Sequence, residues 1–301
     1  MIEEWIGYIQ KRADGSEMVN YNSPFFPTYI NYSWVSPSAT WINDPHFHDD
    51  IEIVTVTEGY MGFCVNGEEI LLNEGDTLFV NSDIIHYSMS KRTERTTCVL
   101  FIFHPGILCS SNAVESKYIT PVIKNPGIPF IHFTPDNELG RKMHTDVLEL
   151  TKYVANELKI THQCFEIWEN VLDSCREMLT TETNLYPNSQ IEALKKMLNF
   201  IQKEYMNPIT LEEIASAGNV SRTFCNNLFK KYTNQTPIEN LTRFRVGKVA
   251  DYLKDTGLSM AEIASITGFA GSSYMSETFR KYFGESPRNY KKREGWKDMS
   301  V

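Results

Sequence analysis

The sequence predicts an α+β protein in which an N-terminal β-barrel with two flanking helices precedes an all-α domain of two helix-turn-helix units. Three observations support this fold class. Short runs rich in β-branched residues, separated by turn signals, occupy residues 28–133. Helical spacing of apolar residues follows over residues 136–180. A helix–turn–helix pattern then occurs twice in the C-terminal third, with the copies 49 to 50 residues apart.

Length and composition are those of a globular protein. The 301 residues suffice for two domains, and an apolar content of 42% suffices for ordinary cores. The longest apolar run, 98–103, is far shorter than the roughly 20 residues of a membrane helix. The chain starts with acidic residues where a signal peptide has basic ones, and its six cysteines lack paired spacing. We therefore expect a soluble, cytoplasmic protein with reduced thiols.

The net charge of −9 is unevenly distributed. Residues 1–187 hold 12 Lys and Arg against 26 Asp and Glu, a balance of −14, whereas residues 188–301 hold 17 against 12, a balance of +5. A basic excess favours contact with a phosphate backbone. The change coincides with a polar stretch around Pro187 that interrupts helical periodicity. We expect five segments: a barrel over 1–135, a helical pair over 136–180, a linker over 181–190, a double helix-turn-helix domain over 191–293 and a tail over 294–301.

The barrel strands follow one another at short intervals. Residues 51–57 alternate and are rich in β-branched side chains, which is typical of a strand. Asn66-Gly67, the strongest two-residue hairpin signal, separates predicted strands over 61–65 and 68–72. Further strands are predicted over 77–80, 86–90 and 98–103.

Three histidines and a carboxylate form a constellation in this region. His46 and His48 stand two apart on one predicted strand, and Glu52 lies four residues further along on the same face. His86 comes from another strand and completes a set of three imidazoles and one carboxylate. Such a set suits iron, manganese, nickel or zinc.

The spacing of these residues resembles the two motifs of the cupin family. Gly59 follows the first group and Gly75 precedes His86, while Asn81 and Asp83 replace the usual Pro and Gly of the second motif. The resemblance implies a cupin-like barrel that binds a small-molecule effector. The cluster either holds a divalent transition metal or is a polar group that orients a ligand or seals the barrel, and no cofactor is required. The candidate effector-binding residues are His46, His48, Glu52, His86, Trp41 and Tyr60, of which His46, His48, Glu52 and His86 are the candidate metal ligands.

Residues 136–180 show two apolar stripes at helical spacing, which predict two antiparallel helices packed on the barrel. The first stripe comprises Leu139, Met143, Val147, Leu150, Val154 and Leu158, and the second comprises Cys164, Ile167, Val171, Cys175 and Met178.

Each copy of the C-terminal repeat is predicted to be a helix, a tight turn and a second helix. Thr210 and Ser259 are N-cap residues with a glutamate three positions later, the arrangement of a capping box. The turns require a residue that tolerates positive φ, which Asn219 and Gly268 supply. Ser221 caps the second helix of the first copy.

The second helix of each copy has the composition of a DNA reader, with short polar side chains followed by Lys or Arg. We expect an inward face of Phe224, Leu228 and Phe229 in the first copy and of Tyr274, Thr278 and Phe279 in the second. The predicted base-contacting residues are Arg222, Thr223, Asn226, Asn227, Ser272, Ser273, Ser276 and Glu277. The predicted phosphate-contacting residues are Lys230, Lys231, Arg280 and Lys281.

The stretch 191–292 resembles the DNA-binding domain of the AraC/XylS transcription regulators. The specific signature lies at 263–269 and 279–284 and extends to Pro287, and a long helix is expected over 237–254. The resemblance implies two recognition helices entering successive major grooves, about 34 Å apart. It also implies a homodimer, formed partly through the helical pair, and activation through RNA polymerase. The family often has Arg where Asn227 and Glu277 stand, so base preference does not carry over.

Two functions fit these features. The first is a sequence-specific, DNA-binding transcription regulator controlled by a small molecule in the barrel, without catalytic activity. The second is a metal-dependent cupin enzyme, such as an isomerase or dioxygenase, with an appended DNA-binding domain. The sequence shows no nucleophile constellation and no phosphate loop, so other catalysis has no support.

Overall fold

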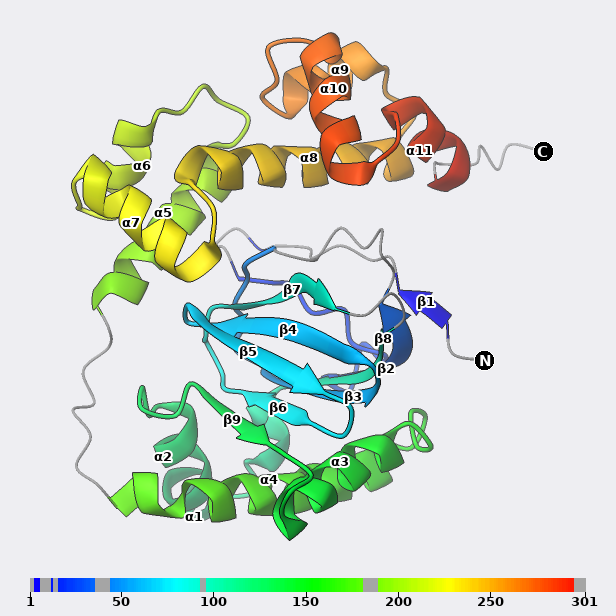
Figure 1. Cartoon of the computed structure of the whole chain (residues 1–301), viewed down its shortest axis with the longest axis vertical. Coiled ribbons are helices and arrows are strands. Elements are labelled where there is room, and N and C mark those ends of the chain that lie inside the picture. The colour runs from blue at the N-terminus through cyan, green and yellow to red at the C-terminus, as the bar shows by residue number, and fades with distance from the viewer. Residues whose placement is uncertain are drawn as a thin grey trace. The chain divides into compact units, whose positions relative to one another are not determined.

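The computed structural model describes residues 3–5, 12, 16–35, 44–92, 96–180 and 189–294 (Figure 1). The chain divides into two compact units, with the boundary between Asn188 and Ser189. Most of the predicted linker, 181–188, and most of the predicted tail, 295–301, lie outside the described residues. No helix in the described part of the chain is both long and apolar enough to cross a membrane.

The N-terminal unit contains two β-sheets. The six-stranded sheet has the order β1 (Glu3–Trp5), β2 (Thr28–Val35), β8 (Thr96–Phe103), β3 (Ile51–Glu58), β6 (Thr77–Val80) and β9 (Phe130–Phe133). The three-stranded sheet has the order β5 (Glu68–Asn73), β4 (Tyr60–Val65) and β7 (His86–Arg92). Asn66 and Gly67 have φ values of 49° and 84°, so the β4–β5 hairpin turns as the sequence predicts.

Strand β3 is buried on both faces, although its alternating sequence predicts one polar face. Ile51 and Ile53 pack in a core that the sheet forms with helices, while Val54 and Val56 pack in a second core between the two sheets. Strand β8 alternates between the same two cores. The central strands are therefore held from both sides, which makes them a rigid base for the side chains they carry.

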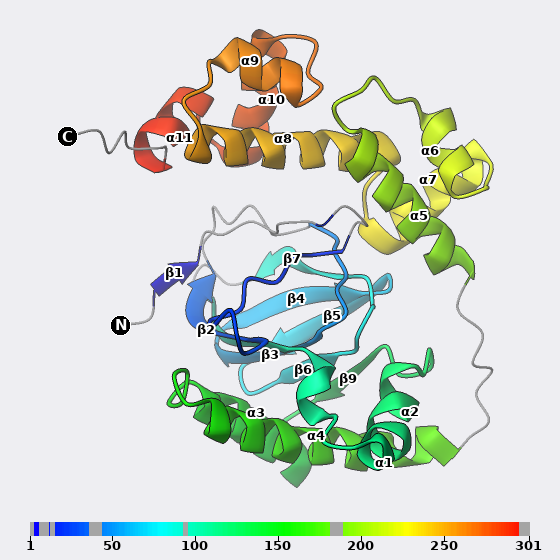
Figure 2. The same ribbon diagram turned by 180° about the vertical axis from the view of Figure 1, so that it is seen from behind.

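Helices cover one face of the six-stranded sheet (Figures 1 and 2). Short turns come first: η1 (Pro105–Leu108), α1 (Asn112–Val114), η2 (Glu115–Ile119) and α2 (Thr120–Ile123). The two long helices are α3 (Glu138–Leu150) and α4 (Glu157–Thr180), which matches the predicted helical pair. The Trp168 ring of α4 meets Phe79 of the sheet edge to face.

The apolar stripes of this helical pair are shorter than the sequence predicts. Val154 and Leu158 are 43% and 81% exposed, because Val154 lies between the helices and Leu158 lies in the first turn of α4. Met178, near the end of α4, is 46% exposed. The other apolar residues of both stripes are buried or half-buried.

The C-terminal unit is all helical and repeats one arrangement twice. Its helices are α5 (Ser189–Glu204), α6 (Leu211–Ala217), α7 (Arg222–Thr233), α8 (Pro237–Asp255), α9 (Met260–Ile266), α10 (Ser272–Phe283) and α11 (Pro287–Glu294). Helix α8 runs between the two groups, with α6 and α7 near its start and α9 to α11 near its end (Figures 1 and 2). Its apolar side contributes Val246, Val249 and Leu253 to the core of the second copy. Together the two units confirm the predicted fold class.

The predicted helix starts are confirmed in atomic detail. Thr210 and Ser259 each accept a hydrogen bond from the backbone of the glutamate three residues later, whose side chain accepts one in return. A third capping box, not predicted, starts α8 at Thr236. Ser221 caps α7, whereas Gly271 begins α10 without a side-chain cap.

The two turns have the predicted backbone conformation, with φ of 54° at Asn219 and 74° at Gly268. Gly268 is constrained further, because a Cβ there would lie 2.3 Å from the Tyr205 carbonyl oxygen and 2.9 Å from Arg245 Nε. Both atoms are firmly placed, so no side chain fits at this position.

We expect Gly268→Ala to destabilise the C-terminal unit. The positive φ costs about 1–2 kcal/mol for an L-residue, and crowding against a backbone carbonyl adds about 1–3 kcal/mol. Gly257→Ala is the matched control, since Gly257 has no atom within 4 Å of its ideal Cβ. The measurement is urea unfolding of the full chain followed by circular dichroism. Equal midpoints for the two variants would contradict the packing described for Gly268.

Candidate functional site

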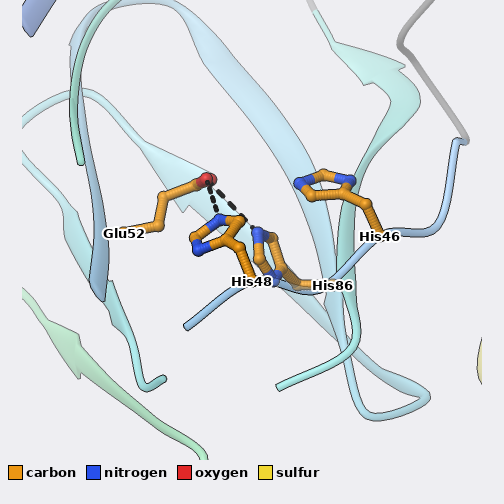
Figure 3. A group of neighbouring side chains, drawn as sticks. All are labelled: His46, His48, Glu52 and His86. Atoms are coloured by element: carbon orange, nitrogen blue, oxygen red, sulfur yellow. Dashed lines mark hydrogen bonds and ion pairs between the residues drawn. The ribbon is translucent and has the colours of Figure 1, made fainter. Parts of the chain in front are cut away.

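The N-terminal unit brings His46, His48, Glu52 and His86 together (Figure 3). One ligand-type atom from each side chain lies within 4.8 Å of those of the others, and all four residues are buried. Glu52 stands near the start of β3 and His86 at the start of β7. The four side chains meet as the sequence spacing predicts.

The backbone between these residues differs from the prediction of one continuous strand. A bend at residues 49–50 separates His48 from β3. His46 instead forms an isolated antiparallel bridge with His86, through N–O contacts of 3.1 and 3.0 Å. The bridge places both imidazoles at one end of the barrel, with ring centroids 4.2 Å apart.

Each imidazole is oriented by a backbone carbonyl two residues away. The Nδ1 atoms of His46, His48 and His86 lie 2.9, 3.0 and 2.8 Å from the carbonyl oxygens of Asp44, Asp50 and Ile84. A carbonyl oxygen only accepts, so each Nδ1 carries the proton and donates. In the neutral ring the lone pair therefore lies on Nε2.

The Nε2 atoms face Glu52. Its Oε2 lies 3.5 Å from His48 Nε2 and 3.3 Å from His86 Nε2. Burial alone would raise the pKa of the Glu52 carboxyl, but the neighbouring imidazoles, His86 foremost, outweigh it and lower the pKa well below its usual range. Burial, and after it the neighbouring His86, lowers the pKa of His46 well below the usual histidine value.

These features fit a divalent transition metal. His48 is 1% exposed, and its Nε2 has no hydrogen-bond partner among the described residues. The ligand-type atoms of three imidazoles and one carboxylate converge within 4.8 Å of one another. A cation at their centre would satisfy all of them, and fixed Nδ1–H groups are the usual support of metal-binding histidines.

Two further predicted effector residues do not join the cluster. Tyr60 lies at the opposite end of β4 from Val65, which pairs with His86, and it is 36% exposed. At about 3.3 Å per residue, that places Tyr60 roughly 16 Å along the strand from the cluster. Trp41 lies outside the described residues. Glu17, which sequence reasoning missed, lies beside the cluster with Oε2 at 3.4 Å from His46 Nε2.

In the C-terminal unit, α7 and α10 present the predicted DNA-contacting side chains at the surface. Of the twelve, Asn226, Ser272 and Ser276 are half-buried and the others are exposed. The Asn226 amide donates to the Arg222 carbonyl at 3.1 Å, while the Asn227 side chain is exposed. Lys230 approaches Glu239 only at 3.9 Å, an exposed contact that restrains the lysine little.

The inward faces predicted for α7 and α10 are confirmed at Leu228, Phe229, Thr278 and Phe279 and wrong at the first residue of each. Phe224 and Tyr274 are 40% and 57% exposed, whereas Cys225 and Met275 are fully buried. The buried residues of α7 repeat at the helical period; they are Cys225, Leu228, Phe229, Tyr232 and Thr233. Phe224 precedes this stripe, and the helix turns it outward.

Arg245 of α8 connects the two helix-turn-helix copies. Its Nε donates to the Tyr205 carbonyl and its Nη2 to the Asn207 carbonyl, both at 2.8 Å. Tyr205 and Asn207 follow α5 in the first copy, and Gly268 of the second copy packs against the same Tyr205 carbonyl. The turn of one copy is thus fastened to the helix end of the other.

Comparison with known proteins agrees with the division of the chain into a β-sheet unit and a helical unit. Residues 214–293 match the model of a helix-turn-helix domain, and residues 35–103 match that of a cupin domain. The chain is 27% identical over 252 residues to the uncharacterized HTH-type transcriptional regulator YdeC of Bacillus subtilis, covering 82% of this chain and 85% of YdeC. It is 23% identical over 256 residues to the melibiose operon regulatory protein of Escherichia coli, covering 82% and 83%.

Among solved structures, the chain is similar to unsaturated fatty acid bound ToxT of Vibrio cholerae. It shares 13% identity with a TM-score of 0.47, over 91% of this chain and 97% of that one. The chain therefore combines a cupin domain with a helix-turn-helix domain, and these relatives over most of its length are transcription regulators. In this organisation the chain is similar to AraC-type transcription regulators that carry an N-terminal cupin-like domain.

We expect Arg245→Gln to lower the free energy of unfolding of the C-terminal unit by about 1–3 kcal/mol, because two carbonyls lose a charged donor. Arg288→Gln, which removes the same charge from an exposed position of α11, is the control and should change stability by less than about 0.5 kcal/mol. Thermal unfolding of the full-length variants measures both. If Arg245→Gln lowered the free energy of unfolding no more than Arg288→Gln does, the link between the two copies would be weak.

Proposed function

We propose that this regulator reads two neighbouring stretches of DNA through α7 and α10 and that a ligand bound at the buried cluster of the barrel controls this binding. The observation that carries the proposal is the duplicated helix-turn-helix unit, with both turns, both capping boxes and both polar outer faces, in one chain with a buried histidine cluster. Ligand control requires that the ligand bind two arrangements of the protein with different affinity.

The proposed DNA contacts follow from exposure. Asn227 and Thr223 lie opposite the buried stripe of α7 and are placed to reach base edges, as Ser273 and Glu277 are on α10. Basic residues stand one turn later and hold phosphates; they are Lys230, Lys231, Arg280 and Lys281. The exposed aromatic side chains of Phe224 and Tyr274 add apolar surface beside them.

The names of the relatives indicate what kind of genes this protein controls. The melibiose operon regulatory protein of Escherichia coli and the Msm operon regulatory protein of Streptococcus mutans, 27% identical over 254 residues, carry the names of operons. We infer that this chain likewise controls an operon, as a homodimer that acts with RNA polymerase in the cytoplasm. The relatives support a regulator over a metal-dependent enzyme.

A metal ion is the ligand class that the cluster favours. His46, His48, Glu52 and His86 would hold it, and the buried, unpartnered Nε2 of His48 is the observation in its favour. Bound there, the ion would supply positive charge that neutralises Glu52 and joins the start of β3 to that of β7.

We expect Lys230→Ala and Arg280→Ala each to weaken binding to all DNA sequences and to reduce the salt-dependence slope by about 1, because each removes one phosphate contact. Fluorescence anisotropy with specific and competitor duplexes at several salt concentrations measures both effects. Lys124→Ala, an exposed charge of the N-terminal unit, is the control and should leave the slope unchanged. An unchanged slope in both recognition-helix variants would place the phosphate contacts elsewhere.

We expect the chelated full-length protein to take up about one Zn²⁺, Mn²⁺ or Co²⁺ per chain, and His86→Ala to weaken uptake by at least about tenfold. His162→Ala is the control, because His162 lies on α4 with its side chain 73% exposed. Elemental analysis and calorimetric titration give stoichiometry and affinity. Equal uptake by the wild type and His86→Ala would remove the cluster as the metal site.

A further inference from the structure

Glu17 approaches the histidine cluster from outside the cupin motifs. Its Oε2 lies 3.4 Å from His46 Nε2 and 4.0 Å from His48 Nε2, and its side chain is only 15% exposed. The Glu17 N–H donates to the carbonyl of Phe47 at 2.7 Å. Since Phe47 stands between the two histidines, this bond fixes the glutamate backbone directly beside them.

The two carboxylates face the imidazoles from two sides. Glu52 contacts His48 and His86, whereas Glu17 contacts His46 and His48. The Nε2 of His48, which lacks a hydrogen-bond partner in the described part of the chain, therefore lies 3.5 Å from one carboxylate and 4.0 Å from the other. The two carboxylates together carry the two negative charges that one divalent cation would neutralise.

The residues around Glu17 are tied to the same stretch of chain. The Tyr21 hydroxyl donates to Asp50 Oδ1 at 2.6 Å, and the Asp50 carbonyl orients His48. Residues 17–21 are thus fastened to the chain at Phe47 and Asp50, one on each side of His48.

We propose that Glu17 is a fifth protein ligand of a divalent transition-metal ion held by His46, His48, Glu52 and His86. The inference rests on the metal site proposed above and deepens it. Five protein donors leave one position of an octahedral ion instead of two, and catalytic metal sites keep positions open for substrate. The ion then acts as the effector, and its binding adds a bond through Glu17 to the contacts that already hold residues 17–21 at Phe47 and Asp50.

The test compares full-length wild type with Glu17→Gln, using Co²⁺ as the probe. We expect Glu17→Gln to bind Co²⁺ about 10- to 100-fold more weakly, and to give a more intense visible spectrum, because Co²⁺ absorbs more strongly as its coordination number falls. Co²⁺ should also slow hydrogen exchange at residues 17–21 in the wild type more than in the variant. Glu58→Gln, at the exposed end of β3, is the matched charge control.

Each outcome decides the question. If Glu17→Gln binds Co²⁺ with the affinity and spectrum of the wild type, Glu17 is no ligand, and the four-residue site stands. If the wild type binds no Co²⁺, the metal site and the role of Glu17 both fail. Glu17→Asp keeps the charge on a shorter side chain, and its affinity should fall between those of the wild type and Glu17→Gln. An affinity equal to the wild type's would contradict direct ligation.

Discussion

The close approach of Gly268 to the Tyr205 carbonyl is the contact on which the geometry of the DNA-binding unit depends. The positive φ of this glycine sets the direction in which α10 leaves the turn. The same carbonyl accepts a hydrogen bond from Arg245 of α8. The Tyr205 carbonyl oxygen, just after α5, therefore contacts both Arg245 of α8 and the turn at Gly268. Two helices can enter successive major grooves of DNA only if the distance and angle between them are fixed.

The sequence predicted most of this unit because its signals are local. A capping box needs two residues three apart, and a left-handed turn needs Asn or Gly at one position. The phase of α7 and α10 is a tertiary property, and here the prediction failed at Phe224 and Tyr274. Cys225 and Met275, each one residue after the aromatic one, complete the buried stripe instead. The role of Arg245 was not predictable either, because its partners are carbonyls 38 and 40 residues away.

The barrel shows the same division between local and distant signals. Strand positions, the hairpin at Asn66-Gly67 and the convergence of the histidines with Glu52 follow from residue types and spacing. The burial of β3 on both faces does not, because it depends on helices α3 and α4, which come some 80 residues later. Glu17 gave no signal, since it lies in an irregular segment far from the motifs and reaches the site through one backbone hydrogen bond.

The way the imidazoles are held limits how the site can transmit a change. Each ring is fixed by a carbonyl within two residues of it, so its orientation does not depend on what occupies the centre. Glu52 belongs to a strand packed on both faces, which resists displacement. Glu17 belongs to a segment outside the central strands, which a backbone hydrogen bond ties to Phe47 and the Tyr21 hydroxyl ties to Asp50. In the proposed site, occupancy would bear on residues 17–21 through Glu17, because its carboxylate lies against His46 and His48 of the cluster.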